Sequence, residues 1–353
     1  MSKKKQIICT KLSFTNNKKG RFLILGGWCL NEIKNLQKFN FEKNRWNKKK
    51  VVERDYKYIK KIFNILNEKI PFLMNSYHNT NYKKKFWQSL LWVWLSQYLA
   101  SIYFRWKTVE NVIYKNKNLI FYSKIKDKNL CCYDTFGFHN FVSSSDYYNE
   151  YLFSKIIKKF DHKIVVSKVN QKIIFKNYIN KEKNYSFKIR LLQKIFFNLS
   201  KVIQSKGKFL INGGFSIKNF LNLHFKKFST PLIVEEEFKE SNKKRLLALS
   251  EFDQLKRKKL KLDILPKNNF EKFLFENIIL DIPIFFFEAF KNELNNINKN
   301  KIDPKLIISS NEHYYNDKFK TWILLKKFSS KTKISINEHG GNHADLNWNF
   351  GYD

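Results

Sequence analysis

Residues 304–343, PKLIISSNEHYYNDKFKTWILLKKFSSKTKISINEHGGNH, carry the clearest secondary-structure pattern in the chain. The apolar run at 305–310 indicates a short buried strand, and apolar residues at helical spacing over 315–328 indicate a helix. A second strand at 331–336 leads into the glycine-containing turn 338–343, which completes a predicted β-α-β unit. Ligands of open α/β sheets bind beyond the carboxyl ends of the strands, so we expect functional chemistry at this turn.

An earlier strand pattern at 21–25 also stops at paired glycines, Gly26 and Gly27, and Trp28 follows them. A strand that ends in glycines before a helix resembles a phosphate-binding turn. The segment lacks the third glycine of the dinucleotide-binding fingerprint and the lysine of a P-loop. A tight strand-to-helix turn with Trp28 packed in the core explains the pattern equally well, so both interpretations stay open.

The alternation of strands with helices along the chain predicts an α/β fold with a parallel sheet. Further strands are predicted at 118–122, 163–167 and 208–211. The length of 353 residues suits two ordinary domains or one large domain with insertions. We predict a basic lead-in at 1–20 and a main α/β unit at 21–350, whose lysine-rich middle, about 115–275, carries no recognised motif.

Two long helices are predicted between the second and third strand patterns. Residues 51–71 have apolar positions at helical spacing, and residues 86–106 form the densest aromatic stretch of the chain. The second stretch approaches the length of a membrane span, but polar residues interrupt it and lysines flank it. We predict a helix buried in a large domain; a helix lying at a membrane interface is the alternative.

The formal net charge of +38 first points to nucleic acid, but the make-up of the charge argues against it. Arginine, the usual bidentate reader of bases and phosphates, occurs at only seven positions, and scattered lysine supplies the rest. Nucleic acid is therefore an unfavoured partner. A general attraction to anionic lipids or polyanions fits the composition better.

The four cysteines, at positions 9, 29, 131 and 132, form no CxxC pair. Neither a zinc site nor a disulfide framework is indicated, and adjacent cysteines do not readily bridge each other. The basic N-terminus is not followed by the apolar core of a signal peptide. We predict a cytoplasmic protein, with contact at the inner face of the cytoplasmic membrane as an extension of the same hypothesis.

Several short motifs, in order along both ends of the chain, resemble a family of bacterial transferases encoded among O-antigen and other surface-polysaccharide genes. They begin with the LGGWCL segment at 25–30 and end with the HGG triplet at 339–341. The intervening matches are Asp55 to Tyr58, His78, Phe86-Trp87, Tyr103 to Trp106, Ile282-Pro283, Glu288, Phe290 and Pro304 to Asn311. Together they cover about half of the chain.

The family is more distantly similar to Kdo transferases and teichoic-acid glycerophosphotransferases, which have a GT-B architecture of two Rossmann-like halves facing a cleft. The resemblance implies that this chain is a Rossmann-like N-terminal half with helical additions. The second half, which binds the donor in such enzymes, would begin near the end of the chain and be cut off at Asp353. We therefore expect an acceptor-side half.

The resemblance also implies a site. His339 would be the general base that deprotonates an acceptor hydroxyl, with Gly340 and Gly341 admitting substrate close to the backbone. Asp55 and Glu32 are secondary candidates for the base, and Arg105 for contact with phosphate. The remaining predicted substrate contacts are Gly26, Gly27, Trp28, Asn311 and His343. For Asp55 and Arg105, a helix-start residue and a surface charge at a helix end are the alternatives.

Two departures from the family pattern bear on the substrate contacts. Glu338 stands where the family pattern has glutamine, and the segment 343–345 replaces a tyrosine-glycine continuation. The expected reaction moves a sugar from a nucleotide-sugar donor to a glycan or lipid-linked acceptor without a cofactor. No metal-binding residues are predicted, and the chain has no DxD pair. An inactive half that binds a partner or a membrane surface, and a lysine-rich nucleic-acid binder, are the rival classes.

Overall fold

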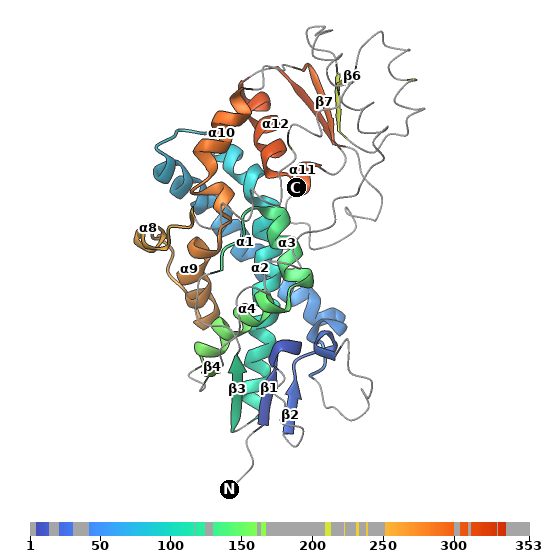
Figure 1. The fold of residues 1–353 in the computed structure, drawn as a ribbon, viewed down its shortest axis with the longest axis vertical. Helices are drawn as coiled ribbons and strands as arrows, with labels where there is room; N and C mark the ends of the chain where they lie inside the picture. Colours follow the sequence, from blue (N-terminus) through green and yellow to red (C-terminus); the bar gives the residue numbers. More distant parts are fainter. Residues whose placement is uncertain are drawn as a thin grey trace.

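The computed structural model is a largely helical protein that carries two small parallel sheets (Figure 1). It describes residues 5–13, 21–30, 42–116, 118–123, 130–160, 164–166, 209–212, 222, 231–232, 238, 251–299, 304–309, 312–329 and 331–336. The predicted α/β class is confirmed. Strands and helices alternate along the chain, as the hydrophobic pattern indicates.

The first sheet has the strand order β2-β1-β3-β4, and the second has the order β6-β5-β7-β8. The strands of the first are β1 (Lys5–Ile8), β2 (Arg21–Ile24), β3 (Leu119–Ser123) and β4 (Ile164–Val166). Those of the second are β5 (Phe209–Asn212), β6 (Pro231–Leu232), β7 (Leu306–Ser309) and β8 (Lys333–Ile336). All pairs are parallel, so the two sheets repeat one topology.

Two features of the sheets differ from the expectation. Residues 1–20 are not simply a lead-in, because Lys5–Ile8 forms β1, a central strand that pairs with both β2 and β3. The surrounding lysines conceal a run of only three apolar or amide side chains that the sheet buries. The predicted β-α-β unit is confirmed as β7, α12 and β8, but it belongs to a second sheet rather than to the sheet that contains β2.

The helices form the body between the two sheets (Figure 1). The longer ones are α1 (Lys49–His78), α2 (Lys84–Lys115), α3 (Thr135–Ser144), α4 (Asp146–Lys158), α9 (Asn269–Asp281), α10 (Phe290–Asn298) and α12 (Asp317–Ser329). The shorter ones are α8 (Gln254–Lys259) and α11 (Glu312–Tyr315). Single 3-10 turns occur at η1 (Lys11–Ser13), η2 (Gly27–Leu30), η4 (Arg45–Asn47) and η9 (Ile284–Phe286).

Helix α2 contains the aromatic stretch and lies in the centre of the core. Trp87, Trp94 and Trp106 are each 2% exposed or less, and buried residues occur all around the helix. A helix that is apolar on every side is one that neighbouring helices enclose, which confirms the buried-helix prediction. Among the described residues, no helix is both long enough and apolar enough to cross a membrane.

Helix α1 shows the expected amphipathic pattern and is longer than predicted. Its buried positions include Ile59, Ile62 and Leu66, which recur every three to four residues. The helix continues past Pro71 and ends at Asn79, whose φ of 52° is left-handed and whose N–H bonds to carbonyls of the last turn. This αL residue is a common helix terminator.

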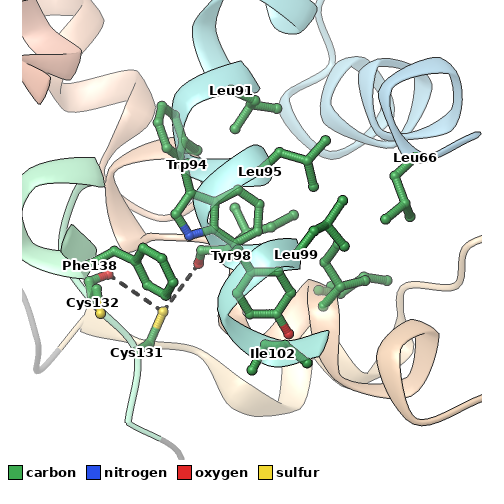
Figure 2. Packing of buried hydrophobic residues seen from close by; sticks show 14 of the residues in the cluster. Leu66, Leu91, Trp94, Leu95, Tyr98, Leu99, Ile102, Cys131, Cys132 and Phe138 are labelled. Atoms are coloured by element: carbon green, nitrogen blue, oxygen red, sulfur yellow. Dashed lines mark hydrogen bonds between the residues drawn. The ribbon is translucent and has the colours of Figure 1, made fainter. Parts of the chain in front are cut away.

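All four cysteines are buried free thiols. Figure 2 shows Cys131 and Cys132 beside Trp94, Tyr98 and Phe138, in the core between α2 and α3. The Cys131 thiol donates to the carbonyl oxygen of Ile282 at 3.1 Å. Burial raises the pKa of the Cys131 thiol to about 12. The thiol is therefore protonated and unreactive at neutral pH, and it acts as a packing residue of the core.

Candidate functional site

Each sheet has a topological switch point, the place where the chain connects from one central strand to opposite sides. In the first sheet it lies between β1 and β3, and in the second between β5 and β7. Open α/β sheets bind ligands outside the carboxyl ends of the strands at such points. The carboxyl edges of the two sheets are therefore the candidate sites, and we call them the first edge and the second edge.

The first edge is organised around a buried carboxylate, Glu150 of α4. Its Oε2 accepts hydrogen bonds from Thr10 Oγ1 at 2.7 Å and from Ser13 Oγ at 2.5 Å. All three residues are fully buried. Because Ser13 Oγ also accepts from the backbone N–H of Cys9 at 3.2 Å, the cluster joins the end of β1 to α4. Hydroxyl donors to a carboxylate are among the stronger hydrogen bonds.

The two thiols at the first edge are unreactive at neutral pH. Burial raises the pKa of the Cys9 thiol well above its ordinary value, and the charge of Glu150 adds to this effect. Burial also raises the pKa of the Cys29 thiol to about 12, although backbone N–H groups of Gly26 and Leu25 oppose it. Since the thiolate is the nucleophilic form, neither thiol can act as a nucleophile here.

Gly26 and Trp28 lie together at the first edge. A Cβ atom on Gly26 would be 2.0 Å from the Trp28 ring, so a larger residue at this position would force the indole or the backbone to shift. The indole Nε1 donates to the Cys9 carbonyl at 3.0 Å, and Trp28 stays 37% exposed. Gly27 starts the 3-10 turn η2. Trp28 is thus an anchored but partly exposed side chain. Neither the interpretation as a core residue nor the interpretation as part of a phosphate-binding turn describes it fully.

Asp55 is a fully buried carboxylate that is already engaged on several sides. It receives two hydrogen bonds from Arg45, at 2.9 and 3.0 Å, and one from the Trp46 indole at 3.1 Å. The Tyr103 hydroxyl approaches it at 3.4 Å. Asp55 therefore fastens the η4 turn to α1 through a bidentate arginine contact.

Aromatic contacts connect these predicted residues. The Phe104 ring of α2 lies 6.1 Å from Trp28 and 4.6 Å from Trp46, which hydrogen-bonds Asp55. Gly26, Trp28 and Asp55 thus lie near Phe104 of α2. The structure brings these three predicted residues into one region, although 29 positions separate Gly26 from Asp55.

Arg105 follows Phe104 in sequence but extends to the junction of α3 and α4. Its Nη atoms donate to the carbonyls of Ser101 and Val142 and to the side chain of Asn149. Burial lowers the pKa of the guanidinium to about 10. Its Nε is buried and has no hydrogen-bond partner among the described residues. Arg105 is therefore a partly buried clamp with one spare donor, rather than a free surface charge.

The second edge carries a buried histidine that the sequence indicated only as part of a helix entrance. His313 of α11 is 4% exposed, and its Nδ1 lies 3.1 Å from Ser309 Oγ, at the end of β7. Burial, followed by the charge of Lys320, lowers the pKa of His313 to about 4. The imidazole is therefore neutral at physiological pH. Its Nε2 has no hydrogen-bond partner within the described part of the chain.

Contacts from α11 and α12 tie the second edge to the helices of the body. Tyr315 accepts a hydrogen bond from Gln97 of α2 at 3.4 Å and packs on His139 of α3 at 4.8 Å. Asp317 accepts from the backbone N–H of Thr135 at 2.7 Å and from the Lys320 ammonium at 2.8 Å. Asp317 and Lys320 are both 2% exposed, so this buried ion pair holds the start of α12 against the start of α3.

Six predicted site residues lie outside the described residues, namely Glu32, Asn311, His339, Gly340, Gly341 and His343. Their roles stay predictions. Within the described ranges, no group of three or more histidine, cysteine, aspartate or glutamate residues could hold a metal ion. The residues that sequence reasoning missed are Thr10, Ser13, Glu150 and His313, each of which pairs or packs across elements in a way that no local motif signals.

The fold and the edges define an α/β protein with two parallel sheets of one repeated topology. A family model described as LIC12162 family transferase matches residues 5–353. The chain therefore belongs to this family of transferases, and the expected transferase class is confirmed at that level. No curated protein and no solved structure matches the chain.

Proposed function

We propose that the protein transfers a sugar from a nucleotide-sugar donor to a glycan or lipid-linked acceptor in surface-polysaccharide or O-antigen biosynthesis. The observation that carries this proposal is the repeated strand order of two parallel sheets in a member of a transferase family. Each sheet offers a switch-point edge toward the same helical body, which suits a reaction with two substrates. One edge would take the acceptor and the other the nucleotide.

This assignment changes the expected division of the chain. The sequence predicted one acceptor-side half, whereas the described residues contain two sheets with four strands each. We therefore propose that the second sheet contributes a binding edge of its own. Support comes from the contacts of α11 with α2 and α3, which join the second edge to the helices that also hold the first edge.

The proposed reaction needs a base, a stabilised leaving group and a protected site. The base takes the proton of an acceptor hydroxyl, and the acceptor oxygen bonds to the anomeric carbon of the donor sugar. The bond between that carbon and the donor phosphate oxygen breaks, and its electron pair stays on the departing nucleotide. We keep His339 as the base, because it follows Ile336, the last residue of β8, by three positions. Arg45 and Trp46 already donate hydrogen bonds to Asp55, which favours a positioning role for this carboxylate.

The test is nucleotide release from a panel of UDP-, GDP- and CMP-sugars, with glycan and lipid-linked acceptors supplied. His339→Ala should lower the rate by about 100-fold or more, the size of a lost general base. The urea midpoint of unfolding serves as the control for folding. A variant that releases nucleotide at the wild-type rate would remove His339 from the mechanism.

A second outcome would reject sugar transfer itself. If the wild-type protein released no nucleotide from any donor, whichever acceptor was supplied, the inactive binding module would become the better description.

His343→Ala provides the comparison for a residue that contacts substrate without transferring a proton. Its effect should appear mainly in KM, whereas the effect of His339→Ala should appear in kcat.

A further inference from the structure

Helix α8 and the segment after it carry a dense basic run on the outside of the molecule. Residues 255–267 read LKRKKLKLDILPK, with six cations and one acidic residue. Figure 1 shows α8 at the periphery of the helical body, away from both sheets. The run is therefore separate from the two edges described above.

One cation of this run, Arg257, is an internal anchor. It is fully buried, and its guanidinium bonds to both carboxylate oxygens of Glu288, at 2.8 and 2.6 Å. Nη1 also donates to the carbonyls of Ile279 and Ile282, at 3.1 and 2.5 Å. The guanidinium lies 4.5 Å from the Phe287 ring centroid. These contacts determine which face of α8 points inward.

The opposite face of α8 points to solvent. Successive helical residues are turned by about 100°, so Leu255 and Lys259, two positions before and after Arg257, lie on the side away from the core. Leu255 is 76% exposed, and Lys258 and Lys259 are exposed as well. Neither lysine has an ion pair or hydrogen bond among the described residues. The helix thus presents an apolar side chain beside exposed cations.

The segment after α8 continues the same surface by alternation. Leu260, Leu262 and Ile264 pack against the main core cluster. The residues between and after them, Lys261, Asp263 and Leu265, are exposed, and Leu265 is 89% exposed. Leu265 is therefore held outward by the burial of its neighbours.

We propose that the surface formed by Leu255, Lys258, Lys259, Lys261 and Leu265, here called the α8 surface, docks on an anionic lipid bilayer. A single exposed leucine is ordinary, but two exposed leucines around exposed lysines suit an interface where apolar tips enter the lipid and ammonium groups meet phosphates. Nucleic acid offers no partner for the leucines. The arginine of the run, the residue type best suited to read bases, is buried.

The test uses the full chain and vesicles of phosphatidylcholine with or without phosphatidylglycerol, at physiological ionic strength. Each lysine near an anionic membrane contributes roughly fivefold to affinity, so Lys258→Gln/Lys259→Gln/Lys261→Gln should weaken binding by about 100-fold. Leu255→Ser/Leu265→Ser should weaken vesicle binding by about tenfold, because the serines bury less apolar surface in the bilayer than the leucines do. Binding to pure phosphatidylcholine should be weak for every variant.

A matched triple variant on α1 controls for the high net charge. Lys57, Lys61 and Lys69 are exposed lysines of that helix, and Lys57→Gln/Lys61→Gln/Lys69→Gln removes the same charge elsewhere. Equal weakening by the two triple variants would overturn the proposal in favour of diffuse attraction. Unchanged binding of the leucine variant, with transfer RNA competing fully for the protein, would identify a polyanion site instead. This test does not depend on sugar transfer.

Discussion

At the first edge a buried carboxylate, Glu150, accepts hydrogen bonds from Thr10 and Ser13, whereas at the second edge a buried imidazole, His313, pairs with Ser309. The two sheets share one strand order, so topology does not cause this difference. At the first edge two hydroxyls donate to one carboxylate oxygen of Glu150 and lock the loop after β1. At the second edge burial keeps the base neutral. The same topology can therefore carry either a structural clamp or a titratable group.

The largest effect should come from breaking the clamp at the first edge. Glu150→Ala leaves the buried hydroxyls of Thr10 and Ser13 without their acceptor. We expect the free energy of unfolding to fall by about 2–4 kcal/mol. Urea denaturation measures this change. Glu150→Gln keeps an acceptor oxygen and should lose clearly less. If Glu150→Ala were as stable as the wild type, the cluster would not hold the edge.

The buried histidine of the second edge should make the free energy of unfolding depend on pH. His313 has a folded pKa of about 4 and an ordinary value of 6.5, so between these values the unfolded chain binds more protons. Stability is therefore lost as pH falls through this window, by about 2 kcal/mol at pH 5 for one such histidine. His78 has the same lowered pKa from burial and adds a similar loss.

The variant His313→Asn separates the two histidines. It should remove about 2 kcal/mol of the loss in unfolding free energy between pH 7 and pH 5, as measured by urea denaturation. His78→Gln is the matched variant, away from both sheet edges. A slope that His313→Asn leaves unaltered would mean that His313 is not a buried neutral base in solution.

The smallest effect should come from the glycine at the first edge. Gly26→Ala places a methyl group against the Trp28 ring, so the indole or the backbone must shift, at a cost of about 1 kcal/mol. The double variant Gly26→Ala/Trp28→Ala removes the obstacle. Its stability should equal that of Trp28→Ala alone, and an additional loss in the double variant would show that the backbone itself requires glycine.

The sequence predicted local elements well where an apolar run stands between clear boundaries. The strands at 21–25, 208–211 and 331–336 match β2, β5 and β8 within a residue or two. The buried nature of α2 followed from a long aromatic stretch that polar residues interrupt. Strand β1 was missed because lysines surround a four-residue run. A short strand gains most of its stability from its neighbours, and its own sequence carries little signal.

The candidate site was predicted only in part. Gly26, Trp28 and Asp55 were identified from motif order, and the structure gathers them near Phe104. Their partners were invisible in the sequence. Arg45 could equally have been a surface charge, and Glu150 lies 140 positions from Thr10. Residue types that are usually exposed give no local sign that a distant element will bury them.

The sequence by itself determined the α/β class, the positions of most strands, the burial of α2 and membership of a transferase family, because these depend on periodicity and motif order along the chain. Only the tertiary structure decided that the strands form two sheets, that Glu150 and His313 lie at their edges, and that Arg257 is buried while its neighbouring lysines are not. Strand pairing and the burial of charge depend on contacts between residues far apart in sequence, which periodicity does not record.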